Sequence, residues 1–287
     1  MTDLAQGTIR VEQDPAEKGA TEKEARLLAR LAELPSLVVA LSGGADSAYL
    51  AWAAHRALGP RSLSVTALSA SFPAYDREQV ERLVREAGLH HEFMETRELE
   101  NPLYTANRAD RCYHCKDELF GVLDRLAAAR GLAAVAYGIN ADDTGDFRPG
   151  HRAAGEHSVL SPLLDAGLTK VEIRSLSRRA GLPTWDRPAS ACLSSRIPYG
   201  SEVTPEKLAQ IERGEAALRE LGFQQFRVRH HGELARIEIA QEEMPRAFEA
   251  GMAREIGRRV RSAGFLYVTL DLEGYRQGSL NDALKVV

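Results

Sequence analysis

The chain has 287 residues, enough for one large or two ordinary domains, and its 44% hydrophobic and 27% charged residues are typical of soluble globular proteins. A net charge of −4 gives no broad basic field, which argues against a nucleic-acid partner. There is no apolar run near the roughly 20 residues of a membrane span and no secretion signal. Three cysteines do not make a disulfide framework, and they suit a cytoplasmic protein that uses thiols chemically.

The N-terminal part of the chain predicts an arm followed by a helix. Residues 1–20 are polar and without a period, so we expect a flexible arm. Thr21 and Glu24 have capping-box spacing, and leucines then recur at helical spacing from Leu27 to Leu34. The leading helix is therefore expected to begin near Thr21.

Strands and helices alternate up to residue 183. Strands are predicted at 37–41, 63–68, 91–95 and 133–137, and helices at 47–58, 76–87, 119–129 and 170–180. This alternation predicts an α/β domain over 21–183 with a parallel sheet and right-handed crossovers. Because ligands bind at the carboxyl ends of such strands, the residues that follow each strand are candidate site residues.

The chain changes character after residue 183. Residues 184–204 hold several prolines and glycines and no strong period, so we expect a linker that carries function. Beyond it the predicted elements are a helix at 205–221, strands at 226–229 and 235–239, a helix at 245–263 and a strand at 265–270. This order predicts a second, smaller α+β domain over 205–287.

The run SGGADS, between the first strand and its helix, predicts a phosphate site. A glycine-rich turn and a helix N-terminus both present N–H groups to an anion, and serine hydroxyls add donors. The spacing is not that of the Walker loop. It resembles the pyrophosphate loop of the N-type ATP pyrophosphatases, and the alternative is an ordinary turn with a serine cap. The predicted ATP-binding residues are Ser42, Gly43, Gly44, Asp46 and Ser47.

The three cysteines are candidates for metal binding or catalysis. Cys112 and Cys115 form a C-x2-C pair, and Cys192 lies in an irregular segment. Three thiolates suit a zinc ion with one further ligand, or a [4Fe–4S] cluster with one open iron, while ordinary thiols at a helix start are the alternative. Arg187 and Arg196 flank Cys192 in sequence and could favour its reactive thiolate over a buried structural cysteine.

Polar residues after the strand at 133–137 are expected to face the same cleft. Asn140, Asp142 and Asp143 follow this strand, and Arg148 continues the loop. Two carboxylates at the open end of an ATP-binding sheet can hold Mg²⁺ or the ribose. A solvated Asp-Asp turn is the alternative.

Together these stretches resemble the LarE family, the ATP-dependent sulfur transferases that make the nickel-pincer cofactor of lactate racemase. The similarity spans nearly the whole chain and rests on SGGADS, RCYHCK, YGINADDTGDFRPG, PASACLSSR and FRVRHHGELARIEI. The last four are more specific than the first, which NAD synthetases, GMP synthetases and tRNA thiolases share. The resemblance implies an adenine nucleotide α-hydrolase-like (PP-loop) domain, a cytoplasmic location and a homo-oligomer, a hexamer in the family.

The resemblance also implies a mechanism. ATP would adenylate a carboxylate of pyridinium-3,5-biscarboxylic acid mononucleotide, and sulfur would then displace AMP, in two rounds. In one form of the family the cysteine matched by Cys192 gives up its own sulfur and becomes dehydroalanine. In the other, three cysteines hold a [4Fe–4S] cluster that carries an extra sulfide from a donor that the sequence does not identify. Because this chain has Cys112, Cys115 and Cys192, the cluster form is favoured.

The remaining candidates contact substrate or metal. They are Ser195, Arg196, Arg227 and Arg229 for the nucleotide or the substrate phosphate, and Glu215, Glu238 and Glu242 for a metal ion. Surface charge is the alternative for the arginines. Two rival functions stay open: another PP-loop enzyme, such as an amide synthetase or a tRNA thiolase, and a nucleotide-binding sensor without chemistry. The excess of acidic over basic residues argues against the tRNA thiolase, and the polar loops after several strands argue against the sensor.

Overall fold

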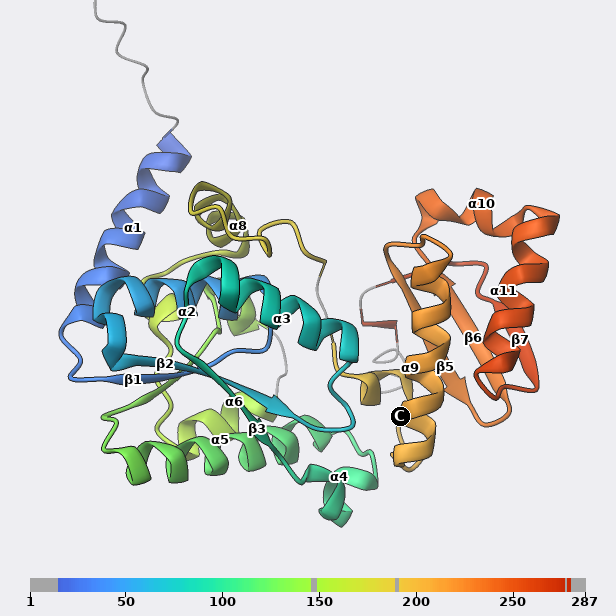
Figure 1. Cartoon of the computed structure of the whole chain (residues 1–287), viewed down its shortest axis with the longest axis horizontal. Helices are drawn as coiled ribbons and strands as arrows, with labels where there is room; N and C mark the ends of the chain where they lie inside the picture. The colour runs from blue at the N-terminus through green and yellow to red at the C-terminus, as the bar shows by residue number, and fades with distance from the viewer. Residues whose placement is uncertain (1–14, 146–148, 189–190, 277, 280–287) are drawn as a thin grey trace, which may run out of the picture.

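The computed structural model describes residues 15–145, 149–188, 191–276 and 278–279. Figure 1 shows an α/β body, which holds α1 to α8 around one sheet, beside a smaller body built from α9 to α11 and a second sheet. In these described ranges, no helix combines the length and the apolar character needed to cross a membrane.

The larger sheet has four parallel strands in the order β3-β2-β1-β4. They are β1 (Leu37–Ala40), β2 (Ser62–Leu68), β3 (His91–Glu95) and β4 (Val135–Tyr137). The prediction of a parallel sheet is thus confirmed. Strands β2 and β3 lie on one side of β1, whereas β4 lies on its other side. The loops after β1 and β4 therefore diverge at a topological switch point, where parallel sheets of this kind bind ligands.

Helices cover both faces of this sheet (Figure 1). One face carries α1 (Pro15–Ala32), α2 (Ala45–Leu58), α3 (Ala74–Ala87) and α8 (Lys170–Arg179), and the other α5 (Arg111–Arg130) and α6 (Pro149–Glu156). Strand β1 is apolar on both sides, because Leu37 and Val39 pack into the first layer while Val38 and Ala40 pack into the second. The short helices α4 (Pro102–Thr105) and α7 (Pro162–Asp165) complete this body.

Helix α1 begins before the predicted capping box, and that prediction is wrong. Thr21 lies inside α1, where its hydroxyl accepts a hydrogen bond from Arg179 Nη1 at 3.0 Å. Glu24 accepts one from the Tyr49 hydroxyl at 2.9 Å and pairs with Arg179. These contacts join α1 to α2 and α8. Thr21 and Glu24 therefore make tertiary contacts and do not cap the helix. The predicted arm before residue 15 lies outside the described residues.

Helix α5 begins at Arg111, well before the predicted start at Leu119. Its first two turns, RCYHCKDE, lack the apolar period by which a helix is recognised in sequence. The structure gives the reason: Arg111 donates to Asn107 and to the Ser194 carbonyl, and Cys115 packs against the apolar side chains around Tyr104 and Leu193 rather than into the core of the sheet.

The second body is the predicted α+β domain. It contains α9 (Pro205–Glu220), β5 (Phe226–His231), β6 (Leu234–Ile239), α10 (Met244–Phe248), α11 (Ala250–Ser262) and β7 (Tyr267–Leu270). Strand β6 pairs antiparallel with β5 and parallel with β7. The single helix predicted at 245–263 is wrong, because extended backbone at Glu249 divides it into α10 and α11. Both halves keep the helical period, so the sequence pattern did not reveal the break.

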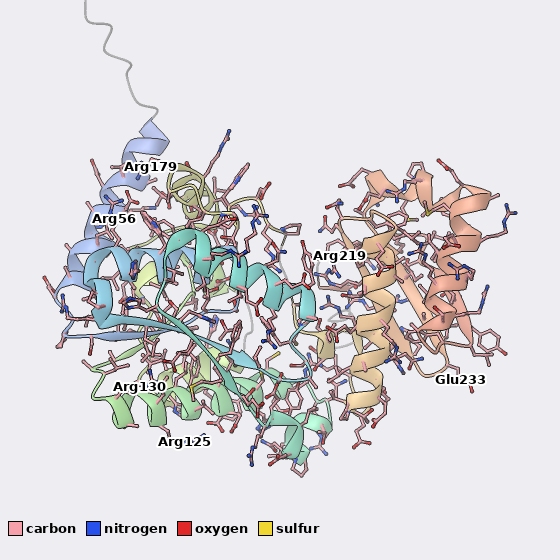
Figure 2. The ribbon with its side chains drawn as sticks, in the orientation of Figure 1. Arg56, Arg125, Arg130, Arg179, Arg219 and Glu233 are labelled. Atoms are coloured by element: carbon pink, nitrogen blue, oxygen red, sulfur yellow. The ribbon has the colours of Figure 1, made fainter. Side chains whose placement is uncertain are left out.

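The two bodies contact each other through α3 and α9. Glu212 Oε1 accepts the Ala74 N–H at 2.6 Å, at the N-terminus of α3. The Arg219 guanidinium lies 3.9 Å from the Tyr75 ring centroid, and Figure 2 labels Arg219 where α9 faces the larger body. A cluster of buried apolar side chains also joins the bodies: Tyr104, Leu193, Ile197, Val203, Leu208 and Ile211.

His157, which lies away from the carboxyl ends of the strands, gives the first testable prediction. His157 lies 2.6 Å from Asp124 Oδ2 and 3.0 Å from Asp117 Oδ1, which joins the end of α6 to α5. Partial burial alone would lower the pKa of His157, but the two carboxylates outweigh it and the pKa is raised above 6.5. His157 therefore adds stability that is fully present below that value and lost as the pH rises through the higher pKa of the folded state.

The His157→Asn variant should accordingly unfold at a lower temperature than the wild type at about pH 5.5 and at nearly the same temperature at about pH 8.5. The effect should stay near or below 1 kcal/mol, because the carboxylates are partly exposed. Calorimetry across this range measures it, and a difference independent of pH would contradict the assignment.

Candidate active site

The turn between β1 and α2 has the form of an anion-binding loop. Gly43 has a φ of +78°, which favours glycine, and a Cβ there would stand 2.8 Å from Val80 Cγ2. The hydroxyls of Ser42 and Ser47 lie 3.0 Å apart, and Ser47 Oγ donates to the Gly44 carbonyl at 3.1 Å. Because the N-cap residue of α2 is Gly44, the N-cap position offers no side-chain acceptor to the first N–H groups of the helix, which suits an external anion.

The chain after β4 lies directly against this loop. A Cβ on Gly138 would stand 2.7 Å from Ser47 N and 2.8 Å from Ser47 Cα, so backbone meets backbone here. Asn140 Nδ2 donates to Asp46 Oδ2 at 3.1 Å. Burial, followed by the negative charge of Asp143, raises the pKa of Asp46 above its usual value. Asn140, Asp46 and Asp143 therefore form one polar group at the switch point of the sheet.

The two neighbouring aspartates have different positions. Asp143 is buried, and its Oδ1 lies 2.9 Å from Lys170 Nζ. Asp142 is exposed and accepts the Lys170 backbone N–H at 2.8 Å. The sequence did not indicate Lys170 as a site residue, although its place at the start of a predicted helix was a usable signal. Arg148 lies outside the described residues.

The segment around Cys192 is held near the SGGADS turn. Leu193 N donates to the Ser71 carbonyl at 2.9 Å, and Ser71 follows β2, the strand that pairs with β1. Ser194 Oγ lies 2.6 Å from the Tyr104 hydroxyl. Cys192 therefore stands at the carboxyl edge of the sheet that carries the SGGADS turn.

The three cysteines act on one another electrostatically. Cys112 and Cys115 lie in the first turns of α5, and Cys192 immediately precedes the short 3₁₀ helix Leu193–Arg196. Burial, then Glu98 and Cys192, raises the pKa of Cys115 to about 12. Cys112 is exposed as a residue, but the partial desolvation of its thiol, followed by the charge of Cys192, raises its pKa. We call these cysteines, with Tyr104, Arg111 and Tyr199 around them, the thiol cluster.

The thiol cluster fits an iron–sulfur cluster in donor type, because all three cysteines are free thiols that act on one another's charge. Within the described residues, however, no three His, Cys, Asp or Glu side chains are gathered closely enough to hold a metal ion. The thiols are therefore neighbours rather than a preformed metal site.

The predicted carboxylate ligands of the second body do not come together. Both Glu215 oxygens bond Arg196, at 2.8 and 3.0 Å. Glu238 pairs with Arg229 at 2.7 Å and Arg236 at 3.1 Å. Glu242 is exposed on the 3₁₀ helix Gln241–Glu243. Since arginines already neutralise the two buried carboxylates, the structure offers no shared metal position for these three residues in its described part.

The arginines near Cys192 in sequence have other partners than its thiol. Arg187 Nη1 donates to the Gly43 carbonyl at 2.7 Å, and its Nη2 lies 2.5 Å from Asp76 Oδ1. Arg196 Nη1 donates to the Cys192 carbonyl at 2.9 Å and to Ser195 Oγ at 3.0 Å. Arg187 thus holds the SGGADS turn, and Arg196 holds the backbone of Cys192. The sequence missed Arg111, whose charge acts on both Cys112 and Cys192.

One of the two arginines of β5, Arg229, also contacts this segment. Arg229 is buried, and its Nη1 donates to the Ser195 carbonyl at 2.8 Å. The Arg227 guanidinium lies 5.0 Å from the Tyr275 ring centroid and donates to the Phe226 carbonyl at 2.6 Å. The structure therefore joins Arg229 to the Cys192 segment through the backbone of Ser195.

The pair Arg196–Glu215 gives the second prediction. Burial alone would raise the pKa of Glu215, but the charge and hydrogen bonds of Arg196 outweigh it and the pKa is lowered. Glu215→Gln leaves a buried guanidinium without a counter-charge, so we expect a loss of about 3–5 kcal/mol in the free energy of unfolding. Urea unfolding measures it. Glu220→Gln on the same helix is the control, because Glu220 is 70% exposed and should cost under about 1 kcal/mol. Equal losses in the two variants would contradict the prediction.

A scan against models of known protein families gives no match. The chain is 36% identical, over 265 residues, to the pyridinium-3,5-bisthiocarboxylic acid mononucleotide synthase of Lactiplantibacillus plantarum, covering 91% of this chain and 95% of that protein. It is 44% identical, over 252 residues, to an uncharacterized protein of Synechocystis, covering 88% and 94%. It is 31% identical to an uncharacterized protein of Methanocaldococcus jannaschii over 170 residues, covering 59% and 66%.

The parallel sheet, with its glycine-rich turn after β1 and a second α+β domain, defines an α/β protein of the PP-loop class. The match to the synthase covers nearly the full length of both chains. The chain belongs to the LarE family, as its motifs predicted.

Proposed function

We propose that the protein is an ATP-dependent sulfur transferase that converts pyridinium-3,5-biscarboxylic acid mononucleotide into its thiocarboxylic and dithiocarboxylic forms, for the nickel-pincer cofactor of lactate racemase. The observation that carries this proposal is the bond from Leu193 N to the Ser71 carbonyl at 2.9 Å, which holds Cys192 beyond the end of β2, the strand that pairs with the strand before the SGGADS turn. The name of the relative from L. plantarum supports the product class. We further propose that the protein is cytoplasmic and forms a homo-oligomer. Native mass spectrometry of the purified protein tests the oligomeric state.

The first step of the proposed reaction is adenylation. A carboxylate oxygen of the substrate attacks the α-phosphorus of ATP, the bond to the β-phosphate breaks, and pyrophosphate leaves. The N–H groups at the start of α2 and the hydroxyls of Ser42 and Ser47 would hold the β- and γ-phosphates. Asp46 and Asp143 would hold the Mg²⁺ that neutralises phosphate charge, in keeping with the raised pKa of Asp46. Asn140 orients Asp46.

The second step is displacement of AMP by sulfur. A sulfur nucleophile attacks the acyl carbon, a C–S bond forms, and the C–O bond to phosphate breaks, so that AMP leaves with the electron pair. The thioacid that results loses a proton. Tyr104, which is hydrogen-bonded to Ser194, and Arg196, which donates to the Cys192 carbonyl, would hold the backbone of the Cys192 segment in place for this step. Arg229 or Arg227 would bind the substrate phosphate, because a guanidinium matches its geometry.

We favour a sulfur source outside the cysteine side chains. Cys112, Cys115 and Cys192 would hold a [4Fe–4S] cluster, which would supply sulfide-level sulfur for the displacement. In the alternative, Cys192 itself attacks the acyl adenylate. Loss of its α-proton then breaks its Cβ–S bond, which releases the thioacid and leaves dehydroalanine.

The test of the proposed function is exchange of labelled pyrophosphate into ATP, together with mass analysis of the products. We expect exchange only when the dicarboxylate mononucleotide is present, and a thioacid product only when a sulfur source is added. Exchange that needs tRNA or ammonia, or ATP cleavage that needs no carboxylate, would contradict the proposal and favour a rival PP-loop enzyme.

The source of sulfur has its own test. Anaerobic purification and reconstitution should give a protein that contains iron and sulfide and keeps its intact mass after turnover. A protein without iron after reconstitution, whose mass falls by the elements of hydrogen sulfide after one turnover, would instead establish the sacrificial route through Cys192.

A further inference from the structure

Arg187 contacts the glycine pair of the SGGADS turn from outside the turn. Its Nη1 donates to the Gly43 carbonyl at 2.7 Å, and its Nη2 lies 2.5 Å from Asp76 Oδ1, in the first turn of α3. A Cβ on Gly43 would stand 3.2 Å from Arg187 Nη1, so the guanidinium also packs directly against this glycine. The two branches of one side chain therefore join the SGGADS turn to α3.

The surroundings of Arg187 hold its guanidinium in one position. Its side chain is only 11% exposed. Arg174 of α8 donates from Nη2 to the Arg187 carbonyl at 2.7 Å, and the Tyr75 ring centroid lies 5.8 Å from the guanidinium carbon. Because both α3 and α8 contact Arg187, the Gly43 carbonyl meets a donor that is already fixed in place, which keeps the cost of reorganisation low.

The bond to the Gly43 carbonyl also sets the direction of the next N–H group. The peptide between Gly43 and Gly44 is trans, so its C=O and N–H groups point in opposite directions. The Gly44 N–H therefore points away from Arg187, and within the described residues it has no hydrogen-bond acceptor. An N–H group of this kind, just before the start of α2, suits a phosphate oxygen.

This peptide needs an anchor because the residues on both sides of it are glycines. Gly43 has a φ of +78°, and neither glycine has a Cβ that would restrict rotation. Without an anchor the peptide could turn over and present its carbonyl oxygen, which repels a phosphate, in place of its N–H, which attracts one. The hydrogen bond from Arg187 favours the orientation that attracts the anion.

We propose that Arg187 is a positioning residue for the phosphates of ATP, and that it acts by holding the Gly43 carbonyl so that the Gly44 N–H faces the β- and γ-phosphates. This inference rests on the proposed function and deepens it, since it gives the segment that carries Cys192 a part in adenylation as well as in sulfur transfer. An ion pair with Asp76 alone would occupy one branch of the guanidinium, whereas here the other branch binds the turn.

Equilibrium dialysis of the full-length protein against labelled ATP with Mg²⁺, and separately against labelled AMP, tests this proposal without any carboxylate substrate. The variant that combines Arg187→Gln with Asp76→Asn removes both members of the ion pair, so no buried charge is left without its partner. We expect it to bind ATP at least about tenfold more weakly than the wild type, because a phosphate loses an N–H donor. AMP lacks the β- and γ-phosphates, so its binding should stay unchanged.

Arg187→Lys carries the test if heat unfolding shows that the double variant is not folded. A lysine keeps the charge opposite Asp76, but its ammonium group lacks the fork that reaches two acceptors on different elements, so ATP affinity should again fall. Arg82→Gln is the matched control. Arg82 lies on α3, as Asp76 does, but its side chain is 55% exposed, and its removal should leave both affinities unchanged.

Equal ATP binding in the wild type and in the folded Arg187 variants would overturn the inference, as would a wild type that binds no ATP. An equal weakening of ATP and AMP would also overturn it, because this result indicates a general disturbance of the fold. Failure of the proposed function has a different signature: the variants would lose ATP affinity selectively, yet the wild type would show no pyrophosphate exchange with the dicarboxylate mononucleotide.

Discussion

Replacing Cys192 with alanine should abolish formation of the thioacid while exchange of pyrophosphate into ATP continues. Cys192 would supply or hold the sulfur in either form of the reaction, whereas the SGGADS turn, Asn140 and Asp143 would carry out adenylation without it. We expect thioacid formation to fall by at least about 10³-fold, because no other group of the site replaces a lost nucleophile. Mass spectrometry of the product and labelled pyrophosphate exchange measure the two steps separately.

The variants Cys112→Ala and Cys115→Ala sharpen this prediction. In the cluster form both should lose thioacid formation as completely as Cys192→Ala, whereas in the sacrificial form both should keep a single turnover. Thioacid made at the wild-type rate by Cys192→Ala would contradict the central role of this residue.

Replacing Gly138 with alanine should disable the ATP loop. The new Cβ would stand 2.7 Å from Ser47 N and 2.8 Å from Ser47 Cα, closer than real Cβ contacts. The atoms on both sides are backbone, so either the end of β4 or the SGGADS turn must move. A displacement of about 1 Å at a site of this kind costs about 10²-fold in rate, and we expect kcat/KM for pyrophosphate exchange to fall by about that factor.

The control for Gly138→Ala is Gly155→Ala. Gly155 lies within α6, and a Cβ there would meet no atom within 4 Å. This variant should keep its exchange activity and gain a few tenths of a kcal/mol in stability, since alanine is the better helix former. Wild-type exchange in Gly138→Ala would show that the loop tolerates the contact, and it would contradict the proposed position of ATP.

Local pattern predicts the elements that build the sheet. The buried runs of β1, β2 and β4 and the half-buried β3 are each short apolar or alternating segments, and β3 was predicted with its observed bounds, His91–Glu95. The SGGADS turn could be recognised because six adjacent residues carry it. The contact between Lys170 and Asp143 could not be recognised in this way, because it depends on how a helix distant in sequence packs against the loop.

Arginine partners could not be predicted from neighbours in sequence. Arg187 and Arg196 lie close to Cys192 along the chain, yet Arg187 bonds Gly43 of the SGGADS turn and Asp76, and Arg196 bonds Glu215. Arg111 is distant from Cys192 in sequence, yet its Nη1 donates to the Ser194 carbonyl, two residues beyond Cys192, at 2.8 Å. A long flexible side chain reaches whatever charge the fold presents, so its role follows from tertiary structure.

The central claim is that AMP is placed on a substrate carboxylate so that sulfur can displace it. The most direct measurement uses pyridinium-3,5-biscarboxylic acid mononucleotide labelled with heavy oxygen in its carboxylates, followed by mass analysis of the AMP released. Adenylation predicts that each AMP formed carries one labelled oxygen, because the bond broken in the second step is the acyl C–O bond. Unlabelled AMP, or label found in inorganic phosphate, would contradict the account.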